Sequence, residues 1–415
     1  MKHDVVVVGA GLAGLTCALR LAEGGKKVLV LARGMGAIQV AGGTIDVLGY
    51  APERVGEPAR ALGGFIAENF GHPYARVGEQ RIAAACDWFK GGPLPYAYEG
   101  DLARNFFLPT AAGAVKPAAL VPVTMAAGDI RAGGRFLIAG FSALKDFYPA
   151  YAAANLMRAG DGVEARPVML NVAPQGEADV TPLGFARHFD DLGGRRDMVA
   201  ELRPQIEPGE SVGFPAVLGL TEVPRTWPEI QDELGAPVFE IPTLPPSVPG
   251  LRLLRALRAA LRERGARMIT GAEVTAAGAG RRVPAVTTQA ANRKIRHELD
   301  DLVLATGGFA SGGLTMDSYG NVRETVVGLP VTGVPAPDEA RFSPKYFGSH
   351  PMSSAGVAVD DELRPLDEEE NIVYENVRVV GATLGGAEPW REKSGDGISL
   401  ATGVAAADAV LKRRA

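Results

Sequence analysis

Asp4-Val5-Val6-Val7-Val8-Gly9-Ala10-Gly11-Leu12-Ala13-Gly14 is the stretch that decides the fold of this chain. The β-branched run predicts a buried strand, and Leu12, Leu15 and Leu19 follow at helical spacing. A second apolar run begins at Val28. A strand, a glycine turn, a helix and a second strand within about 30 residues are typical of a dinucleotide-binding βαβ unit.

Each glycine of this G-x-G-x-x-G motif has its own expected role. Gly9 permits the tight turn, Gly11 lets the backbone approach a phosphate, and Gly14 lets helix and strand pack closely. The helix that starts at Leu12 and Ala13 offers free N–H groups and a partial positive charge to the anion. This context predicts nucleotide binding, and the alternative is a purely structural glycine turn.

The end of the second expected strand lacks an acidic residue. A carboxylate at this point normally accepts hydrogen bonds from ribose hydroxyls, whereas this chain has Leu31, Ala32 and Arg33. The missing carboxylate argues against standard NAD recognition, and it favours FMN over FAD as the flavin considered below. Arg33 either contacts a phosphate or faces solvent.

Composition excludes several classes of protein. The chain has 415 residues, 47% of them hydrophobic and 22% charged, so it is expected to bury a large core in more than one unit. A net charge of -5 without a basic block argues against nucleic acid as a partner. Cys17 and Cys86 are too few for a disulfide framework or for a zinc or iron–sulfur centre, and no metal site is expected. Neither a membrane span nor a signal peptide is predicted, so we expect a cytoplasmic protein.

Three later segments again place glycine after an apolar run or before a helix. They are Thr306-Gly307-Gly308, Gly381 and Ser394-Gly395-Asp396-Gly397. This order favours a flavin, because in the two-part flavin-binding fold a late strand returns beneath the cofactor and the last helix points its N-terminus at the flavin. The predicted fold class is α/β, a two-part Rossmann-like flavin-binding fold with an inserted α+β substrate or partner lobe.

The expected domain division is discontinuous. The flavin-binding domain takes residues 1–55, 251–310 and 351–415, and the substrate or partner lobe takes 56–250 and 311–350. Residues 251–264 carry leucines on one face of a predicted helix. The arginines of that helix are therefore expected on a solvated face: Arg252, Arg255, Arg258 and Arg262.

Further residues are candidates for contact with flavin or substrate. Gly42-Gly43-Thr44 is expected beside the flavin ring and phosphate, although paired glycines also mark ordinary turns. His350 is a candidate acid or base, with a purely structural histidine as the alternative. Since arginine meets phosphate bidentately, a phosphorylated substrate would need basic side chains. The candidates for that contact are Arg323, Arg341, Lys345 and Arg391.

One family resemblance extends through nearly the whole chain. It rests on Met1–Leu48, Leu108-Pro109-Thr110, Phe141–Pro149, Pro242–Gly250 and the C-terminal glycine segment. These stretches resemble the B subunit of anaerobic glycerol-3-phosphate dehydrogenase, the flavoprotein subunit of that respiratory enzyme. The Pro-Thr-Leu-Pro-Pro-Ser-Val-Pro-Gly string is the most specific of them.

That resemblance implies a flavin, assigned in the family as FMN. It also implies oxidation of sn-glycerol 3-phosphate to dihydroxyacetone phosphate, a catalytic A subunit as partner, and a membrane-associated iron–sulfur C subunit that passes electrons to quinone. The protein would then sit at the inner face of the cell membrane through its partners. Two alternatives stay open: a flavin electron-relay protein that does not oxidise the substrate itself, and an unrelated fumarate-reductase-like FAD oxidoreductase.

Overall fold

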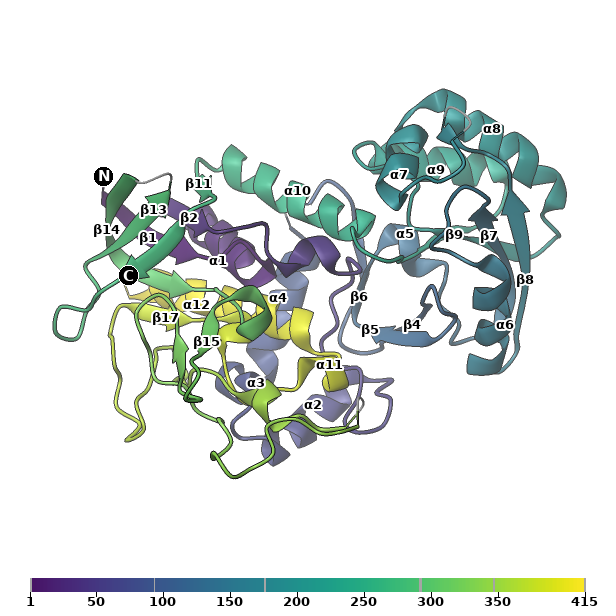
Figure 1. Cartoon of the computed structure of the whole chain (residues 1–415). Helices are drawn as coiled ribbons and strands as arrows, with labels where there is room; N and C mark the ends of the chain where they lie inside the picture. The colour runs from purple at the N-terminus through teal and green to yellow at the C-terminus, as the bar shows by residue number, and fades with distance from the viewer. Residues whose placement is uncertain (1, 93, 175–176, 291–292, 346–347, 414–415) are drawn as a thin grey trace.

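The computed structural model describes residues 2–92, 94–174, 177–290, 293–345 and 348–413. They form a larger and a smaller lobe, and both ends of the chain lie in the larger one (Figure 1). The larger lobe contains a 7-stranded sheet in the order β11-β2-β1-β14-β13-β12, with β17 paired to β14. Its strands are β1 (Lys2–Val8), β2 (Val28–Ala32), β11 (Arg267–Thr270), β12 (Glu273–Ala276), β13 (Ala285–Ala290), β14 (Arg293–Leu304) and β17 (Val377–Val379).

The centre of this sheet is parallel and buried. β1 pairs with β2 and with β14, so that Val8 lies between Leu31 and Leu304. Every residue of β2 is buried, as expected for a parallel strand whose two faces are covered. The carboxyl ends of these strands therefore meet at one edge of the sheet, where the glycine turns after β1 and β14 follow.

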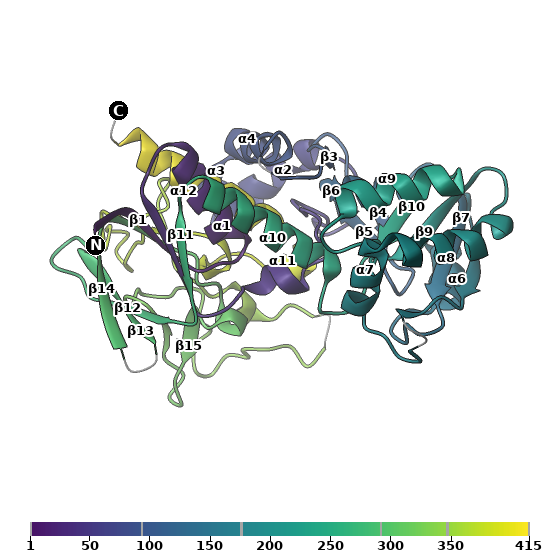
Figure 2. The same cartoon turned by 90° about the horizontal axis from the view of Figure 1, so that it is seen from above.

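Helices pack against this sheet and against one another. α1 (Leu12–Glu23) and α12 (Gly395–Lys412) lie close together, because a Cβ at Gly403 would come within 2.6 Å of the carbonyl oxygen of Ala13. α10 (Val248–Glu263) runs from the smaller lobe back along the larger one (Figures 1 and 2). The larger lobe also contains α2 (Pro58–Glu68), α3 (Pro73–Val77), α4 (Glu79–Lys90), α11 (Pro389–Glu392), β15 (Leu314–Met316) and β16 (Val322–Glu324).

The smaller lobe has a parallel sheet of its own in the order β10-β9-β7-β8. Stacked aromatic rings fill its core, with Phe141 4.8 Å from Phe185 and 6.3 Å from Phe214 between ring centroids. Its elements are β7 (Gly134–Phe141), α6 (Pro149–Ala159), β8 (Val163–Leu170), α7 (Pro182–Asp190), α8 (Leu192–Leu202), β9 (Glu210–Pro215), α9 (Val223–Leu234) and β10 (Val238–Ile241). Both lobes combine helices with parallel strands, in agreement with the expected α/β class, and the four-stranded sheet of the inserted lobe is entirely parallel.

The two largest hydrophobic cores divide the chain differently from the expected boundaries. Leu62, Tyr74 and Phe89 fall within the expected lobe, yet they are buried in the core that contains β1 and α12. Val326 and Leu329 belong to that core as well. The second core takes its buried residues from 130–241. Because a domain is defined by the core it buries, we propose that the inserted lobe begins near residue 127 and ends near 241.

Short strands occupy the region between the lobes. β4 (Phe106–Pro109) pairs with β5 (Val115–Ala118), and β3 (Tyr98–Gly100) pairs with β6 (Leu120–Pro122), which leads into α5 (Val123–Ala126). Among the residues that the structure describes, no helix has the length and apolar character needed to cross a membrane.

Arg252 does not lie on a solvated face, as its helix pattern predicted. It is 5% exposed, and its guanidinium donates to both carboxylate oxygens of Glu240 on β10, at 2.5 and 2.9 Å. Arg255 is exposed as expected. The difference arises because the N-terminal part of α10 packs against the smaller lobe. The spacing of apolar residues along a helix does not predict such a contact.

Candidate functional site

The glycines of the first turn fall into two kinds. Gly9 has a φ of +119°, and an added Cβ would lie 2.0 Å from the carbonyl oxygen of Ala305, while one at Gly14 would lie 2.1 Å from the carbonyl oxygen of Gly9. An added Cβ at Gly11 would meet nothing within 4 Å. Gly9 and Gly14 are therefore required by the fold itself, whereas Gly11 borders open space at the start of α1.

That open space suits a phosphate group. Gly11 is the N-cap of α1 in an extended conformation, and no side chain caps the helix. The N–H groups of Leu12, Ala13 and Gly14 have no acceptor within the helix, because the first turn of any α-helix leaves its donors free. A cradle of free donors at the positive end of a helix binds an anion, so these residues fit the phosphate of a flavin nucleotide.

The segment after β2 lies over the same turn. A Cβ at Gly36 would come within 2.8 Å of the Cα of Gly11, so this backbone packs directly on the cradle. Arg33 is exposed, with its guanidinium 3.9 Å from the position of a Cβ at Gly312. The end of β2, at Leu31, Ala32 and Arg33, has no acidic residue, and its one cation, Arg33, is exposed.

The later glycine segments are tied to the first one. Gly307 has a φ of +78°, and its N–H donates to Thr383 Oγ1 at 2.9 Å. Gly381 has a φ of +67°, its N–H donates to Thr402 Oγ1 on α12 at 2.9 Å, and a Cβ there would lie 2.8 Å from that of Ala13. Thr306 and Gly308 flank Gly307 at the end of β14. Direct contacts therefore connect the end of β14, the turn at 381, the start of α1 and the interior of α12.

The loop 41–46 joins this unit to the start of α12. Gly43 has a φ of +86° and packs on Pro249. The N–H of Gly397 donates to the carbonyl oxygen of Asp46 at 2.9 Å, while a Cβ at Gly397 would collide with the Tyr74 hydroxyl at 2.3 Å. Gly42 and Gly395 are half-buried, with no contact that tight. The expected cofactor glycines from five separate stretches thus lie at one junction.

Sequence reasoning missed a charged cluster at that junction. Lys116 Nζ lies 2.8 Å from Asp46 Oδ2 and donates to Thr44 Oγ1 at 2.7 Å, and Thr44 Oγ1 in turn donates to Asp46 Oδ1 at 2.8 Å. The carboxyl of Asp396, in the first turn of α12, accepts a hydrogen bond from the backbone N–H of Asp46. Lys116 carried no sequence signal, because it belongs to a short hairpin strand without a motif.

Burial and mutual charge shift the pKa values of this cluster. Burial, followed by the negative charge of Asp46, raises the pKa of Asp396 to about 7, against the lowering effect of Lys116. Burial by itself would lower the pKa of Lys116, but the carboxylates of Asp46 and Asp396 outweigh it and raise that pKa. The cluster therefore contains a permanent cation and a carboxyl that changes its charge near neutral pH.

His350 lies on a surface loop before the short helix Pro351–Ser354. Its Nδ1 accepts the backbone N–H of Ser343 at 3.1 Å, and its ring centroid is 5.5 Å from that of Trp390 on α11. The imidazole is half-buried. One ring nitrogen is thus engaged in holding the loop, as a structural histidine would be.

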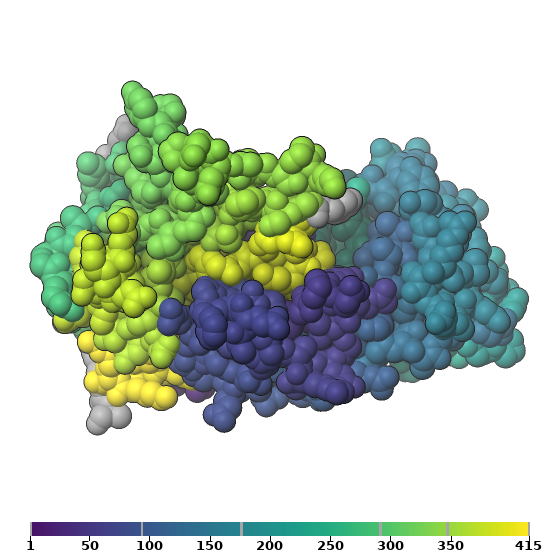
Figure 3. Space-filling model, turned by 90° about the horizontal axis from the view of Figure 1, so that it is seen from below, coloured from purple at the N-terminus to yellow at the C-terminus, as the bar shows by residue number. Residues whose placement is uncertain are grey.

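The four basic phosphate candidates are distributed over surface segments. Arg323 and Lys345 are exposed, and Arg341 Nη1 lies 3.3 Å from the Met316 sulfur. Arg391 forms an ion pair with Glu388 at 2.7 Å. Figure 3 shows the face on which the yellow C-terminal stretch comes to the surface between green and purple stretches. None of the four is buried in a closed pocket within the described residues.

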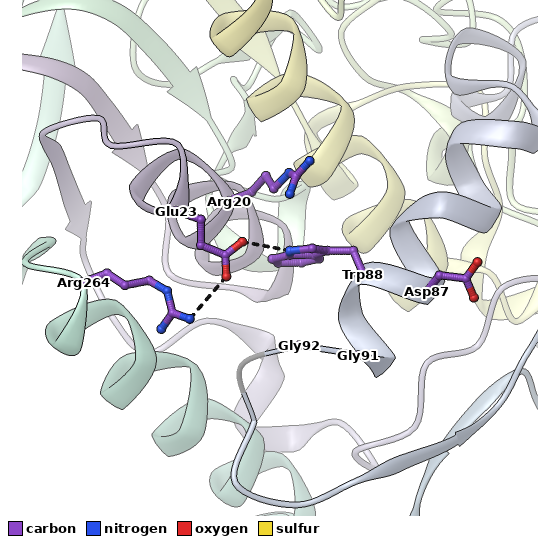
Figure 4. A pocket seen from close by; sticks show the side chains of 7 residues that line it. All are labelled: Arg20, Glu23, Asp87, Trp88, Gly91, Gly92 and Arg264. Carbon is purple, nitrogen blue, oxygen red and sulfur yellow. Dashed lines mark hydrogen bonds and ion pairs between the residues drawn. The ribbon is translucent and has the colours of Figure 1, made fainter.

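A cavity of ≈ 540 Å³ lies at the opposite end of α1 (Figure 4). Trp88 Nε1 donates to Glu23 at 2.9 Å, and Arg264 pairs with the same carboxylate at 3.4 Å. The C-terminal end of a helix presents carbonyl groups and a partial negative charge. The free N–H groups at the other end of α1 are therefore the better candidate for binding a phosphate, although Arg20 and Arg264 line this cavity.

Comparison with known proteins agrees with the glycine geometry. Residues 4–398 match the family described as FAD binding domain. A relative from Halobacterium salinarum, named as the probable B subunit of anaerobic glycerol-3-phosphate dehydrogenase, is 34% identical over 99% of this chain and 98% of that one. A relative from Pectobacterium atrosepticum, named as the B subunit of the same enzyme, is 32% identical over 99% of each chain. A solved 3-ketosteroid delta1-dehydrogenase from Sterolibacterium denitrificans has 13% identity and a TM-score of 0.49, covering 99% of this chain and 100% of that one.

The fold and the glycine cradle define a flavin-binding protein, and the flavin expected from the sequence is confirmed. The similarity of the relatives extends over almost their entire length. The chain belongs to the family of anaerobic glycerol-3-phosphate dehydrogenase B subunits. The resemblance drawn from Met1–Leu48 and the Pro242–Gly250 string is thereby confirmed.

Proposed function

We propose that this chain carries out the flavin-dependent oxidation of sn-glycerol 3-phosphate to dihydroxyacetone phosphate and passes the electrons through partner subunits to quinone. The observation that carries this proposal is the near-full-length similarity to relatives named as the B subunit of the anaerobic dehydrogenase, 34% identical in one case. A bound flavin would supply the acceptor for the hydride of the substrate C–H bond. The chain itself must bind the flavin, orient the substrate and take the hydroxyl proton.

Several residues are proposed to hold the flavin. The free N–H groups of Leu12, Ala13 and Gly14, with the open side of Gly11, suit its phosphate. The segment 306–308, Gly381 and the start of α12 at 395–397 form the remaining cradle, with the loop 42–44 beside it. Arg33 remains a candidate phosphate contact at the rim.

We propose FMN as the flavin, with FAD as the alternative. The support is the absence of a carboxylate at Leu31, Ala32 and Arg33, which leaves an adenosine ribose without its usual acceptor. Release of the cofactor from purified protein and identification by mass would decide. FMN at close to one equivalent per chain is the expected result, and FAD alone at one equivalent would contradict it.

We also propose a complex with a catalytic A subunit and a membrane-associated iron–sulfur C subunit. The designation of the relatives as B subunits supports an assembly of several chains. This chain has only two cysteines, both buried, so an iron–sulfur relay must come from elsewhere. The assembly would hold the chain at the inner face of the cell membrane. Native co-purification should yield a complex that contains iron, and full-rate quinone reduction by the isolated chain would contradict the proposal.

The reaction is tested by flavin reduction. Anaerobic addition of glycerol 3-phosphate to the purified, flavin-loaded chain should bleach the flavin absorption, and glycerol without phosphate should not. Arg323, Arg341 and Lys345 remain candidates for the phosphate contact, and Arg391 is already paired with Glu388. If the flavin bleaches only in the assembled complex, the chain is an electron relay, an alternative that the exposure of Arg323 and Lys345 supports.

A further inference from the structure

Lys116, Asp46 and Asp396 are brought together by backbone contacts. The N–H of Ile45 donates to the carbonyl oxygen of Leu120 at 2.8 Å, which fixes the loop 41–46 against the strand that follows Lys116. The N–H of Gly397 donates to the carbonyl oxygen of Asp46, which fixes the start of α12 against the same loop. Backbone hydrogen bonds therefore hold together the three segments that carry the cluster, and the side chains of Lys116, Thr44 and Asp46 complete it.

The cluster lies next to the paired glycines 42 and 43. A Cβ at Gly42 would stand 3.8 Å from Lys116 Nζ and 3.5 Å from Pro242, so both flank the loop proposed to contact the flavin. The side chain of Lys116 is 24% exposed and that of Asp46 is 7% exposed. Asp396 is half-buried in the first helical turn of α12. Lys116 and Asp396 thus keep part of their surface open to solvent, and Asp46 is the more buried of the two acidic residues.

A contribution to folding stability does not explain why Lys116, Asp46 and Asp396 are gathered in a largely buried cluster. Removing two charges from water costs about as much as their attraction returns, so buried ion pairs are weak contributors to folding. Titratable groups with strongly shifted pKa values gather at functional sites. The cluster combines these features at the junction where the flavin is expected, beside the backbone of 42–44 and 395–397 that is proposed to hold it.

We propose, on the basis of the function proposed above, that Asp396 is the catalytic base and accepts the proton of the substrate hydroxyl, with Asp46 and Lys116 as the residues that position and tune it. A bound oxidised flavin would take the hydrogen of the substrate C–H bond together with the electron pair of that bond. The O–H bond breaks, its proton goes to the Asp396 carboxylate, and the carbonyl bond forms. Lys116 stabilises the developing negative charge on the oxygen.

The groups that face Asp396 determine its charge. Asp46 raises its pKa, and Lys116 and Lys393 lower it. Burial raises the pKa of Tyr74 and of Tyr98 well above 10, so both hydroxyls stay neutral. Glu392, on the adjoining α11, pairs with His72 at 3.1 Å. Asp46 and Lys116 must therefore act on Asp396 in opposite directions, which makes the proposal testable.

Four variants of the flavin-loaded enzyme test this. Asp396→Asn should lower the rate of flavin reduction by glycerol 3-phosphate by roughly 10²–10⁴, the usual range for general-base catalysis, with flavin content unchanged. Asp46→Asn should move the pH profile of that rate toward lower pH, and Lys116→Met should move it toward higher pH. Glu369→Gln, an exposed acid on the turn at 367–370, is the matched control and should leave the profile unchanged.

An infrared pH titration of the oxidised holoenzyme gives a second readout that needs no turnover. The wild-type enzyme should show a carboxyl titrating at about 7 that is lost in Asp396→Asn and displaced in Asp46→Asn. A wild-type rate in Asp396→Asn would overturn the proposal, as would pH shifts of the same sign in Asp46→Asn and Lys116→Met. If a variant does not fold, the titration of the wild-type enzyme decides, and the lack of a carboxyl that titrates at about 7 would overturn the proposal. If the wild-type flavin is not reduced by glycerol 3-phosphate at all, the proposed function fails instead.

Discussion

Gly9, Gly11 and Gly14 share one motif, but the structure needs them for different reasons. Side chains at Gly9 and Gly14 would collide with main-chain oxygens at 2.0 and 2.1 Å, whereas Gly11 has an allowed φ of -79° and open space before it. Only at Gly11 can a substitution impair flavin binding without also impairing folding. The motif predicted all three positions, and only the packing distinguishes them.

Gly11→Val should therefore abolish flavin binding without unfolding the protein. Its branched side chain would fill the space in front of the free N–H groups of α1, and the chain itself has nothing there to clash with. Flavin absorbance per chain should fall to background. The unfolding free energy of the flavin-stripped variant should stay within about 1 kcal/mol of the stripped wild type. Gly14→Val is the contrasting variant, which should fail to fold; a yellow Gly11→Val protein would rule out the assigned cradle.

At the scale of elements, α10 joins the two lobes through one of its four arginines. The guanidinium of Arg252 donates to Glu240 on β10 and to the carbonyl oxygen of Gly219. The N–H of Leu218 donates to the same carboxylate at 2.9 Å, so both oxygens of the buried Glu240 carboxylate accept hydrogen bonds. This contact attaches the helix of the larger lobe to the carboxyl end of a strand in the smaller one.

Arg252→Ala should destabilise the protein by about 3–5 kcal/mol, because it leaves the Glu240 carboxylate buried without its cation. Arg255→Ala, on the exposed face of the same helix, should change the unfolding free energy by no more than about 0.5 kcal/mol. Urea unfolding of the two variants provides the measurement. Equal stabilities would show that the ion pair does not hold the lobes together.

At the scale of the whole molecule, two cores support one junction. The larger lobe supplies the starts of α1 and α12 and the loop 41–46, and the hairpin before the smaller lobe supplies Lys116. The junction carries a carboxyl that is more easily protonated in the folded state than in the unfolded one. Folding stability is therefore linked to its protonation.

Asp396 should make the stability of the molecule fall as the pH rises. Its folded pKa of about 7 exceeds the ordinary value of 3.8, so its contribution is fully present below pH 3.8 and is lost as the pH rises to about 7. Relative to wild type, Asp396→Asn should gain stability between about pH 4 and 7 and hold that gain above. Denaturant unfolding of flavin-free protein at pH 4, 6 and 8 would measure this; a difference that is constant across the series would contradict it.

The sequence by itself determined the strand, turn and helix at the start of the chain, the late glycine segments and the family. Those features are local, since an apolar period and a glycine at a fixed offset dictate backbone geometry over a few residues. The tertiary structure alone decided that Lys116 meets Thr44, 72 residues away in the chain, that Asp396 joins them, and that Arg252 is buried. It also decided that residues near 62–89 pack with the larger lobe. Such contacts depend on how distant elements align when their apolar faces are buried, and no local pattern in a single sequence specifies that alignment.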